Sequence, residues 1–303
     1  MIRLDDLQVF VRTADAGSFS AAARQLDSTP ALASSAILRL ERALGLRLFV
    51  RSTRRMRLSE EGERYLPHAR EAVAALASGQ SALAHGRDTI AGPLRLSAPS
   101  DFGRNVLLPW LDDFQQLHPQ LSLHLRISDQ VADFFQQPLD AVLRYGLLAD
   151  SGLVSMPVAP WNRRTLCAAP TYIARHGAPQ SPDDLRSHNC LRYVMGEHTH
   201  QRWSFHLPAG VQTVSVDGDR VSDDADVVRR WAVAGLGLLY KSRLDVDGDL
   251  RSGQLVELFP PAQGEPSPLQ LVSAHRSALT PAVQQLRHFL VERCEKLVPA
   301  EAN

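Results

Sequence analysis

Arginine side chains are concentrated in one short stretch near the N-terminus of this 303-residue chain. Between Arg39 and Arg57 the only acid is Glu41, although the whole chain carries equal numbers of acidic and basic residues and a formal net charge of zero. Guanidinium groups at this density suit binding to phosphates of a nucleic acid, and the alternative is a solvated charged face. The arginines are Arg39, Arg42, Arg47, Arg51, Arg54, Arg55 and Arg57.

The elements that would position these arginines follow from periodicity and helix-ending residues. Thr29 can cap a helix, Pro30 suits its first turn, and Gly45 can end it. A helix, a tight turn and a second helix that begins with small polar side chains place the second helix in the major groove of DNA. The helices expected from the pattern cover 4–16, 21–26 and 29–44.

A basic hairpin is expected after the third helix. Residues 46–50 alternate like a strand, 56–58 form a second short strand, and the tip between them is basic. Such a wing would follow the DNA backbone, while Ser and Thr at the start of the third helix can reach bases or phosphates. The side chains expected to contact DNA are Ser18, Ser20, Thr29, Pro30, Ser34, Ser35, Arg39, Thr53, Arg54 and Arg55.

Two sequence runs resemble the DNA-binding domain of LysR-type transcriptional regulators. They are LQVFVRTADAGSFSAAARQL and TPALASSAILRLERALGLRLFVRSTRRMRLSEEG, which together span most of the N-terminal region. The resemblance implies an all-α-type winged helix-turn-helix domain over 1–59, with the helix-turn-helix at 19–38. Family members usually carry Lys, Arg or Gln at the position of Ser35, so a different base preference is expected there. The alternative is a small helical domain that binds protein.

A long helix is expected over 60–88 as a linker. Ser59 can cap it, and Pro67 should bend its first turns. Small and apolar residues step along it by threes and fours, which is typical of a dimerisation seam, although a helix packed within its own chain is the alternative. The resemblance favours a homodimer or homotetramer. The seam residues are Gly62, Tyr65, Ala69, Ala72, Leu76, Gly79 and Leu83.

Strands that alternate with helices over 89–303 predict an α/β domain with a parallel sheet. The segments APSDFGR, DAVLRYG, LCAAPTYIARHG and AGLGLLY are similar to the effector domain of the same family, which has the two-lobed form of periplasmic binding proteins. The resemblance implies lobe I over 90–163 and 267–303, and lobe II over 164–266. Strands are expected at 94–98, 121–127, 140–145 and 235–239, a loop at 99–103, and helices up to 117, at 224–234 and at 280–298.

A small anionic effector, such as a carboxylate, is expected between the lobes, because ligands of open α/β sheets bind at strand ends and helix starts. Ser100 and Asp101 could instead merely cap a helix, and Arg144 could form a structural ion pair. Asp101 would repel an anion unless it points away. The expected contacts are Ser100, Asp101, Phe102, Gly103, Arg144, Tyr145, Tyr240 and Lys241.

Other function classes find less support. The chain has no nucleophile elbow, no phosphate loop and no G-x-G-x-x-G that opens a helix, so we expect neither an enzyme nor a cofactor. His198 and His200 favour a polar loop over a metal site, and the three cysteines are expected to be reduced and buried. A pure solute-binding protein would leave the N-terminal region unexplained.

The sequence therefore predicts a cytoplasmic regulator of transcription. The chain shows neither a signal peptide nor a run of about 20 apolar residues, so no membrane association is expected. The expected partners are duplex DNA at a pseudo-palindromic promoter site, a small-molecule effector and further copies of the chain. RNA polymerase is a further candidate partner.

Overall fold

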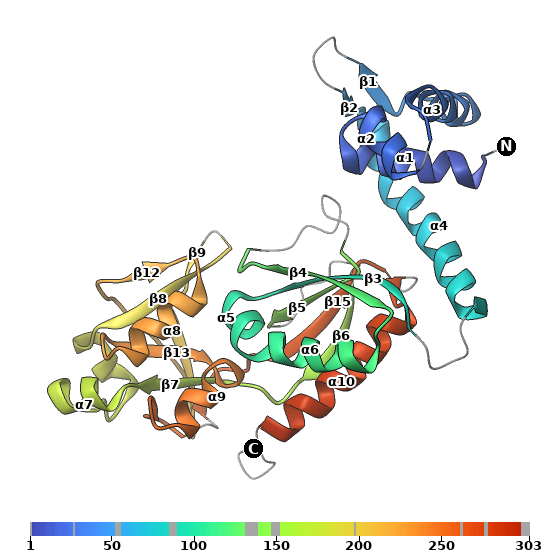
Figure 1. The fold of residues 1–303 in the computed structure, drawn as a ribbon. Helices are drawn as coiled ribbons and strands as arrows, with labels where there is room; N and C mark the ends of the chain where they lie inside the picture. Colours follow the sequence, from blue (N-terminus) through green and yellow to red (C-terminus); the bar gives the residue numbers. More distant parts are fainter. Residues whose placement is uncertain are drawn as a thin grey trace. The chain divides into compact units, whose positions relative to one another are not determined.

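The chain folds into two packing units, residues 1–89 and 90–303, which are described separately (Figure 1). The computed structural model describes residues 2–26, 28–51, 56–84, 90–130, 139–146, 152–196, 198–260, 263–275 and 278–297, without the side chains at 51, 71, 74 and 77–84.

The first unit is a three-helix core with a small hairpin and a long helix. Ser18 caps α2 by accepting the Ala21 N–H at 3.1 Å, and Thr29 caps α3 by accepting the Leu32 N–H at 3.3 Å. Gly45 ends α3 with a φ of 72°. The elements are α1 (Leu4–Ala16), α2 (Phe19–Gln25), α3 (Pro30–Leu44), β1 (Phe49–Arg51), β2 (Met56–Leu58) and α4 (Glu60–Ala84).

Polar groups hold the hairpin against the helices. The Glu41 carboxylate of α3 accepts the N–H groups of Leu48 and Phe49 at 2.8 and 3.3 Å. These bonds place the first strand at 49–51, slightly later than the expected 46–50. Ser59 caps α4 as expected, because its Oγ accepts the Gly62 N–H at 3.0 Å.

The proposed seam of α4 is divided between two environments. Tyr65 and Ala69 pack in the core of the first unit, and a Cβ on Gly62 would lie 2.2 Å from the Leu48 carbonyl oxygen. These first seam positions therefore serve packing within the chain, which is the alternative reading of the pattern. Leu76 is different, because half of its surface is exposed (50%) in the single chain.

The second unit begins with a mixed five-stranded sheet, which we call lobe I together with its helices. Its order is β4-β3-β5-β15-β6. β3 pairs in parallel with β4 and β5, whereas β15 is antiparallel to β5 and β6, so the expectation of a parallel sheet was only partly right. The elements are β3 (Gly92–Ala98), β4 (Leu121–Ile127), β5 (Ala141–Tyr145), β6 (Val154–Ala159), β15 (Leu269–Ser273), α6 (Leu108–Leu117) and α10 (Pro281–Leu297).

A second sheet, of order β12-β8-β13-β7-β14, forms lobe II with its helices. β13 is fully buried and extends to Ser242, so Tyr240 and Lys241 lie within this strand rather than after it. Its strands are β7 (Arg164–Ala168), β8 (Cys190–Met195), β12 (Val221–Ser222), β13 (Leu238–Ser242) and β14 (Val256–Glu257), with β9 (His198–Thr199) paired to β8. β10 (Arg202–Leu207) and β11 (Gly210–Ser215) form a separate two-stranded sheet. The helices are α7 (Pro170–His176), α8 (Ala225–Val233) and α9 (Arg243–Arg251).

The loop expected at 99–103 is helical from Ser100 onward. A run of helix continues from α5 (Ser100–Phe102) through a π-helical turn (Gly103–Leu107) into α6. Gly103, at the end of the expected loop, has a φ of −60°, which is ordinary for a helix. Its function is steric, because a Cβ there would lie 2.3 Å from the Ile127 side chain of β4.

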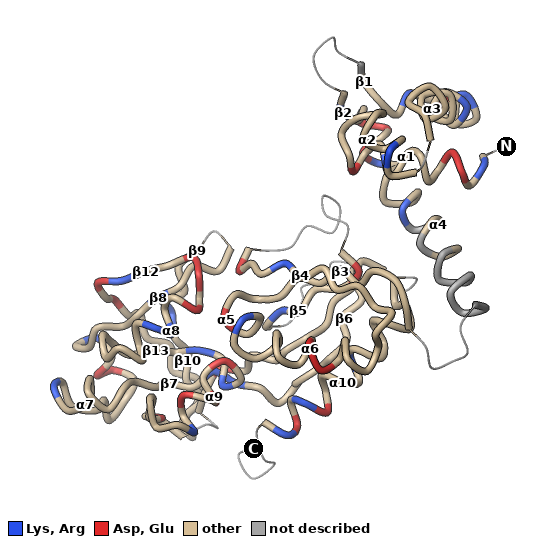
Figure 2. Tube along the Cα trace, viewed as in Figure 1, with Lys and Arg blue, Asp and Glu red and all other residues tan. Residues whose placement is uncertain are grey.

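Buried ions join the two lobes. Asp101 of α5 has no exposed surface, and both Lys241 of β13 and Arg229 of α8 approach its carboxylate to 2.9 Å. Lys241 also binds Asp245 of α9, which accepts the Tyr145 hydroxyl from lobe I. Figure 2 shows acidic and basic positions close together along α8 and α9. We call Asp101, Arg229, Lys241 and Asp245 the interlobe ion cluster.

Opposite charges at contact distance keep Asp101 and Lys241 ionised. Burial raises the pKa of Asp101 to about 6, although the charges of Lys241 and Arg229 oppose that rise. Burial alone would lower the pKa of Lys241, but Asp101 and Asp245 outweigh it and leave that pKa above its usual value. Asp101 and Lys241 are therefore mostly charged at neutral pH, and each depends on the other.

Replacement of Lys241 tests this dependence. Lys241→Met would leave Asp101 and Asp245 without their shared cation, so we expect a loss of about 3–5 kcal/mol in the free energy of unfolding. Urea unfolding followed by tryptophan fluorescence would measure it, because all four tryptophans lie in the second unit. Lys296→Met, at the exposed end of α10, is the control and should change stability by less than about 0.5 kcal/mol. Equal effects of the two substitutions would contradict a structural role for the cluster.

Candidate functional site

The exposed face of α3 is the first candidate site. Ser35 and Pro30 are exposed there, and Ser34 is half-buried. Thr29 accepts the cap bond already described, so its oxygen helps to fix the start of this helix. Small polar groups therefore lie on a helix whose first turn is stabilised by the Thr29 cap.

Other expected DNA contacts have structural tasks of their own. Arg39 binds the buried Asp6 carboxylate, at 2.6 Å through Nη2 and 3.3 Å through Nε, which ties α3 to α1. Ser18 caps α2, and Ser20 is exposed in its first turn. Thr53, Arg54 and Arg55 lie outside the described residues.

Two exposed leucines on α3 were missing from the expected contacts. Leu32 is 61% exposed and Leu38 is 41% exposed, although both are large apolar side chains. Leu32 lies one turn before Ser35, on the side of the helix away from Ala33 and Ile37. A helical wheel could have found Leu32, because it lies outside the inner stripe of the helix.

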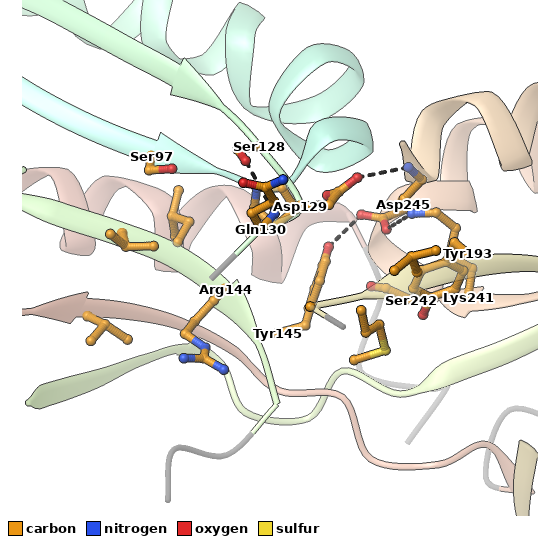
Figure 3. Close-up of a pocket in the computed structure, with 18 of the residues that line it drawn as sticks. Ser97, Ser128, Asp129, Gln130, Arg144, Tyr145, Tyr193, Lys241, Ser242 and Asp245 are labelled. Atoms are coloured by element: carbon orange, nitrogen blue, oxygen red, sulfur yellow. Dashed lines mark hydrogen bonds and ion pairs between the residues drawn. The ribbon is translucent and has the colours of Figure 1, made fainter. Parts of the chain in front are cut away.

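The second candidate site is a cavity of about 330 Å³ between the two lobes of the second unit. Its wall includes Arg144 and Tyr145 from β5, and Lys241 from β13 (Figure 3). Three of the eight expected effector contacts therefore line one cavity. Apolar side chains complete much of the wall, among them Val142, Leu153, Met195 and Val272.

The other expected contacts lie behind or away from this wall. Ser100 and Asp101 are buried next to it, Ser100 in contact with Ala225 and Asp101 in the interlobe ion cluster. Phe102 packs in the core of lobe I. Gly103 contacts Ile127 of β4, as described above. The structure does not bring these four residues to the cavity surface.

Tyr240 is also part of a core. It is fully buried in lobe II, where its hydroxyl donates to the Ser204 carbonyl at 2.6 Å and accepts the Glu265 N–H at 2.6 Å. The side chain of a strand residue alternates between faces, so Lys241 points to the opposite face and reaches the cavity wall.

Arg144 differs from the other charged groups of the cavity wall. Lys241 is neutralised by Asp101 and Asp245, and Arg164 binds the Tyr193 hydroxyl and lies 3.5 Å from Glu265. Within the described part of the chain, no carboxylate pairs with Arg144. Figure 3 shows its guanidinium on the side of the cavity away from Asp245 and Lys241.

Several wall residues were missed from the sequence. Asp129 lies two residues after the end of β4, so the rule that ligand sites gather at strand ends could have found it. Arg164, Tyr193 and Met195 belong to lobe II and also line the cavity. Nothing in their local pattern distinguishes them from other strand residues.

The histidines considered for a metal have other surroundings. The His200 ring lies 5.2 Å from the Tyr193 ring, and burial, together with the charge of Arg164, lowers the pKa of His200 to about 3. This ring is therefore neutral at physiological pH. Among the described residues, no three His, Cys, Asp or Glu side chains are grouped to hold a metal ion.

The described helices include none that is long and apolar enough to cross a membrane. The three cysteines, Cys167, Cys190 and Cys294, are free and buried. Burial raises the pKa of all three thiols, that of Cys190 to about 12.

Comparison with known proteins adds independent support. Residues 4–63 match the bacterial regulatory helix-turn-helix protein, lysR family, and residues 87–295 match the LysR substrate binding domain. The HTH-type transcriptional regulator YhjC of Escherichia coli strain K12 is 32% identical over 96% of this chain and 97% of its own length. The HTH-type transcriptional activator TtdR of the same strain is 32% identical over 84% of this chain and 82% of its own length.

Solved structures agree with these relatives. CrgA, a LysR-type transcriptional regulator from Neisseria meningitidis, is 28% identical with a TM-score of 0.60, over 97% of this chain and 98% of its own. OxyR from Pseudomonas aeruginosa, at 17% identity and a TM-score of 0.70 over 97% of this chain and 95% of its own, shares the fold. The expected family and fold class are confirmed. The protein belongs to the LysR-type transcriptional regulators and carries their DNA-binding and substrate-binding domains.

Proposed function

We propose that this regulator responds to a small anionic effector held between lobe I and lobe II. The observation that carries the proposal is Arg144, a cavity-wall cation without an acidic partner among the described residues. An arginine fork matches a carboxylate well, and the apolar wall suits the rest of a small molecule. The proposed domains are a DNA-binding domain over 1–59, a linker helix over 60–88 and an effector domain over 89–303.

We also propose that α3 reads the major groove of promoter DNA. Ser34, Ser35 and the exposed leucines are the proposed base contacts, with Ser18, Ser20, Thr29 and Arg39 nearer the backbone. The wing arginines Arg54 and Arg55, with Thr53, are proposed to contact phosphate.

The proposed assembly is a homodimer or homotetramer built through the exposed part of α4. Leu76 supports this proposal, because a half-exposed leucine on a long helix can be buried by a second copy. A two-fold dimer implies a pseudo-palindromic DNA site. RNA polymerase is a proposed further partner, and the cytoplasm, where promoter DNA is accessible, is the proposed compartment.

Substitution of Arg144 tests the effector proposal. A thermal-shift screen of small carboxylates should find a ligand that stabilises the wild type, by ~2.7 kcal/mol at about 100 times its dissociation constant. Arg144→Ala should remove this stabilisation and leave DNA affinity unchanged, because the DNA-binding domain is a separate unit. Arg126→Ala, an exposed arginine of β4, should behave as the wild type. An Arg144→Ala protein with a normal ligand response would contradict the proposal.

A base-methyl experiment tests Leu32. We expect its side chain to contact the C5-methyl group of a thymine, so replacement of that thymine by deoxyuracil should weaken binding of the wild type about fourfold, which corresponds to ~0.8 kcal/mol. Leu32→Ala should bind the preferred duplex less tightly and be insensitive to the same replacement. Leu117→Ala, at an exposed leucine of α6, should retain the sensitivity of the wild type. If Leu32→Ala also retains it, the methyl contact is made by another residue.

Substitution of Leu76 tests the assembly. Leu76→Glu would place a charge in the proposed interface, so light scattering after size-exclusion chromatography should show a smaller assembly than for the wild type. Ala75→Glu adds the same charge to the neighbouring exposed position and should have the weaker effect. An unchanged mass for Leu76→Glu would place the interface elsewhere.

A further inference from the structure

The Asp129 carboxylate lies where the two lobes meet at the cavity wall. It accepts the Ser100 N–H at 2.7 Å and also the Ser100 hydroxyl, both from lobe I. From lobe II it accepts the Ala225 N–H, the first residue of α8, at 2.8 Å. Figure 3 shows Asp129 beside the cavity. One carboxylate of the chain therefore gathers donors from both lobes.

These donors are oriented toward a negative charge. The Ser100 Oγ accepts the Ala225 N–H at 3.0 Å and the Asp226 N–H at 3.3 Å, which leaves its own proton for Asp129. The backbone N–H groups at the start of α8 also carry its positive dipole end. We call Ser100 and the Ala225 N–H, with the space between them, the anion seat.

We propose that Asp129 is a specificity-determining residue, because its carboxylate fills the anion seat in place of an acidic group of the effector. The effector then carries one acidic group, which binds Arg144, and a second acidic group is excluded. Two carboxylates that compete for the same donors repel each other, so the resident acid discriminates against dianions. The Arg144 half of this inference rests on the proposed function, whereas the occupancy of the seat by Asp129 is independent of it.

Removal of the Asp129 side chain should make the seat available to a small carboxylate from solution. Asp129→Ala takes away the charged group, so the N–H and O–H of Ser100 lose their acceptor and the Ala225 N–H keeps only the Ser100 Oγ. Acetate has the same carboxylate group with one methyl, so it can supply the missing acceptor. The wild type offers no such vacancy, because its seat is filled from within.

Chemical rescue tests the seat in the full-length protein. Thermal unfolding, followed by tryptophan fluorescence, would compare sodium acetate with sodium chloride at equal ionic strength. We expect acetate to raise the Tm of Asp129→Ala in a saturable manner, with at least a tenfold smaller effect on the wild type. Asp129→Asn should show no rescue, because its amide still fills the space.

Asp140→Ala is the matched control. Asp140 directly precedes β5 and its carboxylate likewise accepts a backbone N–H, from Arg95 at 2.7 Å, but among the described residues it makes no hydrogen bond or ion pair with lobe II. Its loss should not be rescued by acetate. Rescue of Asp140→Ala to the same extent, or equal acetate effects on Asp129→Ala and the wild type, would overturn the assignment of the seat.

A second measurement gives its first result on the wild type alone. Butyrate and succinate have the same four-carbon length, but succinate carries a second carboxylate. Calorimetric titration of the wild type should show butyrate binding more tightly than succinate, and Asp129→Ala should shift this ratio toward succinate. Tighter binding of succinate to the wild type would overturn the exclusion of a second acid. If acetate rescue succeeds while Arg144→Ala leaves ligand binding intact, the seat stands and only the proposed role of Arg144 fails.

Discussion

The arrangement of the second unit depends on the need to neutralise buried charge. Asp101 has no exposed surface, and a carboxylate in that position is tolerated only with cations at contact distance. Lys241 and Arg229 supply them from lobe II, so the same ion pairs that satisfy Asp101 also join the lobes. Removal of one charged partner would leave an opposite charge buried without compensation. The two lobes are therefore held in contact at these particular residues.

This neutralisation also shapes the cavity between the lobes. Lys241 and Asp245 form part of its wall, yet they pair with each other, and Lys241 also pairs with Asp101. Asp129 is compensated by N–H and O–H donors of both lobes. A cavity whose acids and lysine already have partners presents Arg144 as the charge to which a ligand can respond.

The first unit uses polar contacts in the same way, but for a different surface. Arg39 is held by Asp6 and Glu41 by the N–H groups of the hairpin, so both side chains serve the packing of α3. The exposed positions of α3 include Ser35, Leu32 and Leu38, and also Arg42 near the end of the helix. Such a surface combines small polar and apolar side chains, which can approach the edges of bases closely, with an arginine that can bind phosphate.

The sequence by itself determined the local elements. Thr29, Pro30 and Gly45 define the ends of α3 through caps that involve near neighbours, and Ser59 starts α4 in the same way. Arg144 and Tyr145 could be placed at a strand end, because alternation and burial along 140–145 are local properties. Only the tertiary structure decided that Ser100 faces Asp129 and Ala225, that Asp101 meets Lys241, and that Tyr240 belongs to a core. These partners come from different lobes or distant strands, and their pairing depends on burial and desolvation, which no local pattern encodes.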